Sequence, residues 1–97
     1  MKFLLLYNGP PTPPDASHAQ WPDWFNAIGD ALVDIGSPMA NGQSVRGDGS
    51  VSASALDLNG FSIIEAPDAD AARALLKDHP LFALEDYTIE IFEVPRK

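Results

Sequence analysis

Side chains able to carry chemistry are few in this 97-residue sequence. Histidine occurs twice, at His18 and His79, and cysteine is absent. His18 follows a proline-rich stretch, where it could overhang a cleft and serve as a general base near neutral pH. A loop histidine without a chemical role is the alternative. His79 precedes Pro80 at the end of a predicted helix, where a cation would interact favourably with the last carbonyls, so we expect a structural role.

Carboxylates are abundant, and three of them are candidates for a site. Fourteen Asp and Glu residues against six Lys and Arg give a net charge of −8. Asp34 could transfer a proton, although acids along one face of a predicted helix are commonly just solvated. Glu65 and Glu90 lie on predicted strands, and either would be partly desolvated if it pointed into a cleft. Solvation at the sheet edge is the alternative for both glutamates.

Two aromatic residues are candidates for the wall of a binding pocket. Tyr7 ends the first predicted strand, and Trp21 stands at the head of the first predicted helix. Aromatic rings with a polar tip suit small-molecule sites, so we expect Tyr7 and Trp21 to orient a ligand. Trp24, three residues further on, is expected in the core.

Known cofactor and partner signatures are missing from the sequence. It contains no phosphate-binding or dinucleotide motif, no GxSxG and no HExxH, so we expect no cofactor and no metal. Its six cations are scattered, which disfavours nucleic acids and anionic membranes as partners. The tripeptide Arg46-Gly47-Asp48 matches a cell-adhesion motif, but Asp-Gly predicts a hairpin turn there. The absence of cysteine fits a reducing cytoplasm.

These residues must be positioned by alternating strands and helices. Phe3 to Tyr7 is apolar on both faces, as in a central strand. An apolar arc of 3.6-residue period predicts a helix from about Trp21 to Ile35, with Gly36 as its C-cap. The other expected elements are a strand in 39–45, an edge strand or loop over 51–58, a turn at Asn59-Gly60, a strand Phe61 to Ala66, a helix Asp68 to Lys77 capped by Asp68, and a strand Tyr87 to Val94.

This βαββαβ order predicts one α+β domain over residues 1–97. Two helices can cover one face of a four-stranded antiparallel sheet, so the other face must be solvated or paired with another chain. Central leucines on that face favour a homodimer through the sheets, with clefts at its ends. The first apolar run is too short for a signal peptide or a membrane span, so we expect a cytoplasmic protein.

Several phrases in the chain occur in an order that resembles the YCII-related family, which includes the DGPF-domain proteins. They are Met1-Lys2-Phe3-Leu4-Leu5-Leu6, Ala31-Leu32-Val33-Asp34-Ile35-Gly36-Ser37-Pro38, Asp48-Gly49, Gly60-Phe61-Ser62-Ile63-Ile64-Glu65-Ala66 and Thr88-Ile89-Glu90-Ile91-Phe92-Glu93-Val94. The resemblance implies a ferredoxin-like fold and a dimeric α/β barrel. It also implies a small bacterial protein, in a family with a few relatives that act on small aromatic molecules.

Only part of the chemistry proposed for some family members can be carried over to this sequence. Asp34 matches the aspartate of a His–Asp pair proposed for some members, whereas Trp24 and Phe25 stand where the histidine is expected. Neither the indole nor the phenyl ring accepts a proton near neutral pH, so His18 would have to replace that histidine. Ser50-Val51 stands where the family has Pro-Phe.

Two functions are therefore open. The first is a homodimer that binds a small molecule, such as an aromatic one, with cofactor-independent acid–base chemistry by Asp34 or His18 and binding by Tyr7, Trp21 and Glu65. The second is a non-catalytic binding module that acts beside a protein partner. Whether the protein is an enzyme stays undecided at this point.

Overall fold

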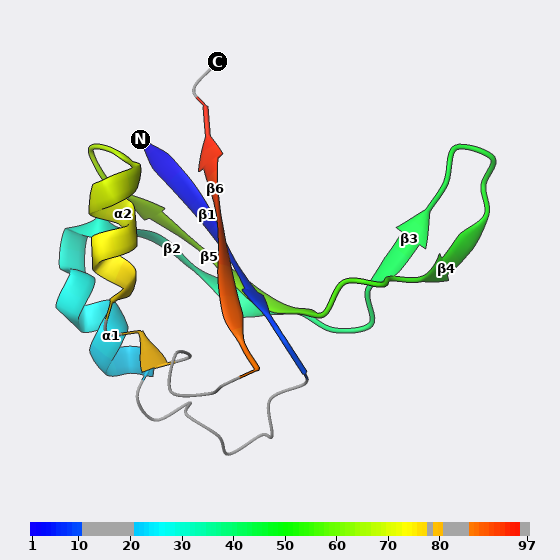
Figure 1. Cartoon of the computed structure of the whole chain (residues 1–97), viewed down its shortest axis with the longest axis horizontal. Coiled ribbons are helices and arrows are strands. Elements are labelled where there is room, and N and C mark those ends of the chain that lie inside the picture. Colours follow the sequence, from blue (N-terminus) through cyan, green and yellow to red (C-terminus); the bar gives the residue numbers. More distant parts are fainter. Residues whose placement is uncertain (11–20, 78, 81–85, 96–97) are drawn as a thin grey trace.

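The structure, a computed structural model, describes residues 1–10, 21–77, 79–80 and 86–95. Its elements follow the chain in the order shown in Figure 1. They are β1 (Lys2–Asn8), α1 (Trp21–Ile28), the short 3-10 helix η1 (Gly29–Ala31), β2 (Leu32–Pro38), β3 (Gln43–Val45), β4 (Val51–Ala53), β5 (Leu58–Glu65), α2 (Ala69–Leu76) and β6 (Thr88–Val94).

Four of the strands form one antiparallel sheet in the order β2-β5-β1-β6. Both α-helices lie on the same face of this sheet (Figure 1). The arrangement is a two-layer α+β fold of the ferredoxin-like type, as the order of elements predicts. In the part of the chain that is described, no helix combines the length and apolarity that a membrane crossing requires.

The core lies between the sheet and the helices. Along β1, side chains buried in this core alternate with side chains that are less buried. Phe3, Leu5 and Tyr7 are buried on the helix-facing side of β1. Trp24 of α1 enters this core and donates a hydrogen bond from Nε1 to the carbonyl oxygen of Leu75 in α2, at 3.0 Å. The bond joins the two helices across the layer, so Trp24 is a core residue as predicted.

The second helix begins where the sequence predicts. The carboxylate of Asp68 accepts a hydrogen bond from the backbone N–H of Ala71 at 2.8 Å, which satisfies one of the donors left open at a helix N-terminus. The helix then runs to Leu76, close to the predicted end at Lys77.

The prediction of one helix from Trp21 to Ile35 is wrong. The helix α1 ends at Ile28, because Gly29 adopts a left-handed backbone conformation with φ of +54°. Residues from Leu32 onward become the edge strand β2, paired with β5. Gly36 does have a positive φ, +77°, but it occupies a register shift between Asp34 and Ser37 and is not a helix cap.

A short hairpin extends away from the four-stranded sheet (Figure 1). Its strands β3 and β4 pair in a separate two-stranded sheet, with Val45 opposite Val51. The turn predicted at Arg46-Gly47-Asp48 is present: the N–H of Gly49 donates to the carbonyl oxygen of Arg46 at 2.9 Å. We call residues 41–56 the arm.

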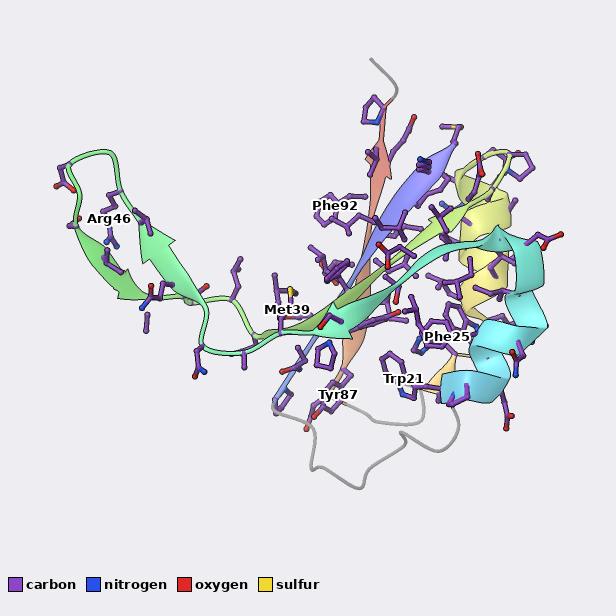
Figure 2. The ribbon with its side chains drawn as sticks, turned by 180° about the vertical axis from the view of Figure 1, so that it is seen from behind. Trp21, Phe25, Met39, Arg46, Tyr87 and Phe92 are labelled. Carbon is purple, nitrogen blue, oxygen red and sulfur yellow. The ribbon has the colours of Figure 1, made fainter. Side chains whose placement is uncertain are left out.

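The side of the sheet opposite the helices carries apolar side chains. Pairing places Leu4 between Ile63 of β5 and Phe92 of β6, and Leu6 opposite Phe61. Side chains opposite one another share a face, so these five residues form one apolar surface, the open face. Phe92 is 54% exposed and points away from the helices (Figure 2).

Candidate functional site

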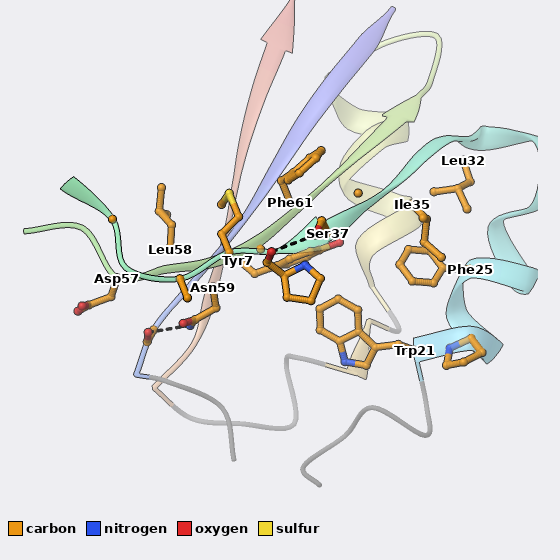
Figure 3. A pocket seen from close by; sticks show the side chains of 18 of the residues that line it. Tyr7, Trp21, Phe25, Leu32, Ile35, Ser37, Asp57, Leu58, Asn59 and Phe61 are labelled. Atoms are coloured by element: carbon orange, nitrogen blue, oxygen red, sulfur yellow. Dashed lines mark hydrogen bonds between the residues drawn. The ribbon is translucent and has the colours of Figure 1, made fainter. Parts of the chain in front are cut away.

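A groove of about 1060 Å³ runs from α1 along β2 to the base of the arm (Figure 3). Its position follows from the fold, because β2 is an edge strand and α1 packs against its helix-facing side. The apolar part of the lining includes Trp21, Phe25, Leu32, Ile35, Met39 and Leu58. Such a lining with few polar groups is typical of sites for small organic molecules.

Tyr7 and Trp21, both predicted as pocket residues, meet in this groove. Their ring centroids are 4.7 Å apart with an interplanar angle of 74°, an edge-to-face contact. Phe25 follows one helical turn after Trp21, with its ring centroid 6.2 Å from that of Trp21. The first two turns of α1 and the end of β1 thus build one aromatic wall.

The hydroxyl of Tyr7 is engaged within the protein. It donates to Oγ of Ser62 at 2.7 Å, and Ser62 donates in turn to the carbonyl oxygen of Ile35 at 2.8 Å. Burial raises the pKa of Tyr7 to about 12, against the smaller opposing effect of the hydrogen bond with Ser62. Tyr7 is therefore neutral at pH 7, and its oxygen can accept but not donate a further hydrogen bond.

His79 supports the aromatic wall from behind. Its side chain is 3% exposed, and its ring centroid lies 4.3 Å from Trp24, 4.8 Å from Trp21 and 5.3 Å from Tyr7. Burial lowers its pKa to about 4, so the imidazole is neutral at pH 7. The expected structural role agrees with this position, but the expected cation at the helix end does not.

Two polar residues of the groove were not predicted. Asn59 donates from Nδ2 to the carbonyl oxygen of Gly9 at 2.8 Å, and the backbone oxygen of Asp57 accepts from the N–H of Gly9 at 2.9 Å. Asn59-Gly60 has the composition of a turn, whereas β5 begins at Leu58 and continues through both residues, with a shift in its register against β1 between Tyr7 and Asn8. A buried glycine at position 60 lets the ring of Tyr7 and the backbone of β2 approach closely.

Charge in the groove has one sign. Among the described residues that line it, Asp57 is the sole carboxylate, and Lys, Arg and His are absent. The described part of the chain also contains no group of three or more His, Asp or Glu side chains arranged to hold a metal ion.

The remaining predicted site residues lie elsewhere. Asp34 is exposed on β2, opposite Ile63, and its carboxylate accepts a hydrogen bond from the N–H of Gly36 at 2.8 Å. Glu65 is exposed at the end of β5, 4.0 Å from the N-terminal amine of Met1. The structure therefore does not bring Asp34 or Glu65 together with Tyr7 and Trp21. His18 lies outside the described residues.

The comparisons with known proteins give one informative likeness. No family model matches the chain, and no curated protein matches its sequence. Among solved structures, the chain is similar to 5-chloro-2-hydroxyhydroquinone dehydrochlorinase TftG from Burkholderia phenoliruptrix AC1100, determined in complex with 2,5-dihydroxybenzoquinone. The likeness covers 100% of this chain and 96% of that chain, with a TM-score of 0.63 and 13% identity. At this identity the two proteins share a fold, and the comparison establishes no more than that.

Proposed function

We propose that this protein binds a small, planar aromatic molecule in the groove. The observation that carries the proposal is the aromatic wall, with the ring centroids of Tyr7 and Trp21 4.7 Å apart and Phe25 beside them. Edge-to-face and stacked contacts with flat rings are the interactions such a wall offers best. The apolar residues along β2 would then cover the second face of the ligand.

The ligand is uncharged and carries a hydrogen-bond donor. Asp57 is the one charged side chain of the described lining, and the chain as a whole has a net charge of −8. An anion would be repelled by both. A phenolic hydroxyl could donate to the carboxylate of Asp57 or to the oxygen of Tyr7.

Two likenesses support this ligand class. The sequence resembles the YCII-related family, in which some relatives act on small aromatic molecules. The similar solved structure is, by its name, a dehydrochlorinase of a hydroquinone, and it holds a benzoquinone. We therefore propose membership of the YCII-related family, with a hydroquinone-like molecule as the kind of ligand.

The protein acts as a homodimer in this proposal, through contact of two open faces. Leu4, Leu6, Phe61, Ile63 and Phe92 would otherwise present a continuous apolar surface to water. Asp34 and Glu65 pair with residues of the same face, so in a dimer they would lie at the edge of the interface.

Acid–base catalysis is the second candidate function. Asp34 and His18 stay proposed as proton-transfer groups on the strength of the family resemblance. Asp57 is a further candidate, because it is the one carboxylate among the described lining residues, at the end of the groove beside the arm. Replacing Asp57 or Asp34 by Asn separates the two assignments, since only the variant of the acting residue would lose turnover while still binding ligand.

Binding is tested with hydroquinone, a neutral planar probe, and 4-hydroxybenzoate, its anionic counterpart. Backbone amide shifts measured by NMR should move in α1 and in residues 57–61 with hydroquinone, and the Kd for 4-hydroxybenzoate should be about ten-fold weaker or more. Trp21→Ala and Phe25→Ala should weaken binding, whereas Val33→Ala, an exposed change outside the groove, should not. Shifts absent from the groove, or equal binding of both probes, would contradict the proposal.

A further inference from the structure

A serine is buried in the apolar core behind the lining of the groove. Ser62 of β5 is 0% exposed, and among the described residues the other buried polar side chain is His79. A buried hydroxyl requires hydrogen-bond partners, whereas an alanine would fill most of the same space without requiring any. Ser62 has two partners, Tyr7 of the aromatic wall and Ile35 of β2. Both partners line the groove, although Ser62 itself does not.

The direction of these two hydrogen bonds is fixed by the carbonyl group at the end of the chain of three residues. Ile35 lies inside the register shift of β2 between Asp34 and Ser37, and its carbonyl oxygen can only accept. Ser62 therefore donates its one proton to Ile35, at 2.8 Å, and its oxygen accepts the proton of Tyr7, at 2.7 Å. The oxygen of Tyr7 is left with lone pairs only, so it acts toward a ligand as an acceptor.

Two further polar side chains of the lining direct their protons into the protein. Asn59 and Ser37 both line the groove (Figure 3). Asn59 donates from Nδ2 to the carbonyl oxygens of Gly9 and Pro10, at 2.8 and 3.2 Å, so the atom that it offers a ligand is Oδ1. Ser37 donates from Oγ to the carbonyl oxygen of Pro38 at 3.0 Å. Toward a ligand, both side chains are therefore acceptors, as Tyr7 is.

The remaining polar groups of the lining follow the same pattern. The carboxylate of Asp57 can only accept hydrogen bonds at neutral pH. The backbone N–H of Gly36 donates to the carboxylate of Asp34 at 2.8 Å and is thus already used. Asn26 and Asn41 are exposed, so water competes with any ligand for their amide protons. The groove therefore offers a ligand mainly hydrogen-bond acceptors.

We propose that Ser62 makes the groove selective for ligands that donate hydrogen bonds. This inference rests on the proposed function and specifies how the groove distinguishes a hydroquinone from the corresponding quinone or ether. Ser62 is a positioning residue, because by accepting the proton of Tyr7 it turns a hydroxyl that could donate to a ligand into one that accepts. A hydroquinone brings protons to these acceptors, whereas a quinone or an ether would place its own lone pairs against theirs.

The affinities for two matched probes test the role of Ser62. Hydroquinone has two O–H groups, and 1,4-dimethoxybenzene has the same ring and the same para oxygens without an O–H. NMR titration gives the selectivity ratio, which is the Kd for 1,4-dimethoxybenzene divided by the Kd for hydroquinone. In Ser62→Ala the proton of Tyr7 can turn toward the groove, so the ratio should fall by about five-fold or more relative to the parent chain. Equal weakening of both probes, which leaves the ratio unchanged, is what a purely structural serine predicts and would overturn the proposal.

Further variants trace the effect to Tyr7. Tyr7→Phe removes the acceptor and should itself lower the ratio, and adding Ser62→Ala to it should change the ratio no further. A second fall in the double variant would overturn the action through Tyr7. Ser52→Ala removes a hydroxyl of the arm, outside the groove, and should leave the ratio within about two-fold of the parent value. If neither probe binds the parent chain, the proposed function fails and this inference with it, whereas binding with a ratio that Ser62→Ala leaves unchanged overturns this inference alone.

Discussion

At the scale of single residues, the aromatic wall of the groove depends on the imidazole of His79 being neutral. Burial lowers the pKa of this imidazole to about 4. His79 sits within 5.3 Å of three aromatic ring centroids and fixes Trp21 and Tyr7 from behind. A neutral ring packs there at a much lower electrostatic cost than an imidazolium, which would lose its hydration in the same place. The geometry of the groove is thus linked to the protonation state of His79.

The protein should lose stability in mild acid because of His79. Its folded pKa of about 4 is below the ordinary value of 6.5, so the unfolded chain takes up the proton first. Well above pH 6.5, His79 is neutral in both the folded and the unfolded chain, so it does not reduce the free energy of unfolding. Between pH 6.5 and 4 the free energy of unfolding should fall by on the order of 3 kcal/mol. Urea unfolding across this range measures it.

His79→Leu supplies the control for this pH dependence. The variant removes the titrating group but leaves the carboxylates and His18 in place. Its stability curve should therefore be flatter than that of the parent between pH 6.5 and 5. Parallel curves for the two proteins would show that His79 does not titrate in the way that its burial implies.

At the scale of elements, the edge strand β2 is the part of the main sheet that the sequence does not predict. The apolar run of β1, the strand pattern of β6 and the cap at Asp68 are local signals, and the structure agrees with them. Leu32 to Ile35 fits a helical arc equally well, and only pairing with the distant β5 makes it a strand. Local periodicity cannot report a partner nearly thirty residues away.

The same limit explains which site residues could be predicted. Tyr7 and Trp21 stand out as aromatic residues at element ends, and the structure brings them together. Asp57 and Asn59 gave no signal, because Asn59-Gly60 has the composition of a turn. Their place in the groove comes from β5 starting at Leu58 and continuing through Gly60, which local turn chemistry does not reveal.

Gly36→Ala should destabilise the edge strand strongly. A Cβ at this position would lie 1.7 Å from the carbonyl oxygen of Phe61, and the φ of +77° is itself unfavourable for alanine. We expect a loss of about 3 kcal/mol or more in the free energy of unfolding. Gly47→Ala is the control, since nothing lies within 4 Å of its added Cβ, and it should be close to neutral. Chemical denaturation distinguishes the two, and similar losses would contradict the close approach of β2 to β5.

Asp68→Ala tests the start of α2. The side chain of Asp68 satisfies the N–H of Ala71, and an alanine there leaves this donor without its cap. The cost should be about 1 kcal/mol, whereas Asp68→Asn, which keeps an accepting oxygen, should cost less. Thermal or urea unfolding measures both. A larger loss for Asn than for Ala would contradict the capping role.

At the scale of the whole molecule, the fold leaves one layer incomplete. The helices cover the face of the sheet that holds Phe3, Leu5 and Tyr7, and the opposite face has no layer of its own in the single chain. Small domains bury a limited fraction of their surface on folding, so packing this apolar sheet face against a second copy would stabilise the chain. The arm, which contributes residues to one end of the groove, extends away from the main sheet (Figure 1).

Phe92→Glu should dissociate the proposed homodimer. Phe92 lies on the edge strand β6, is 54% exposed and pairs with Leu4 on the open face, so contact between two open faces would bury its ring. A glutamate there would be desolvated without a partner, and the dimer Kd should rise by about ten-fold or more. Phe92→Leu keeps the site apolar and should preserve the dimer, and sedimentation velocity compares the three proteins. Because the ring points away from the helices, neither variant should unfold the chain, and circular dichroism verifies this. A Phe92→Glu protein that dimerises as tightly as the parent would mean that the two copies meet through some other surface, and the apolar open face would then need a different explanation.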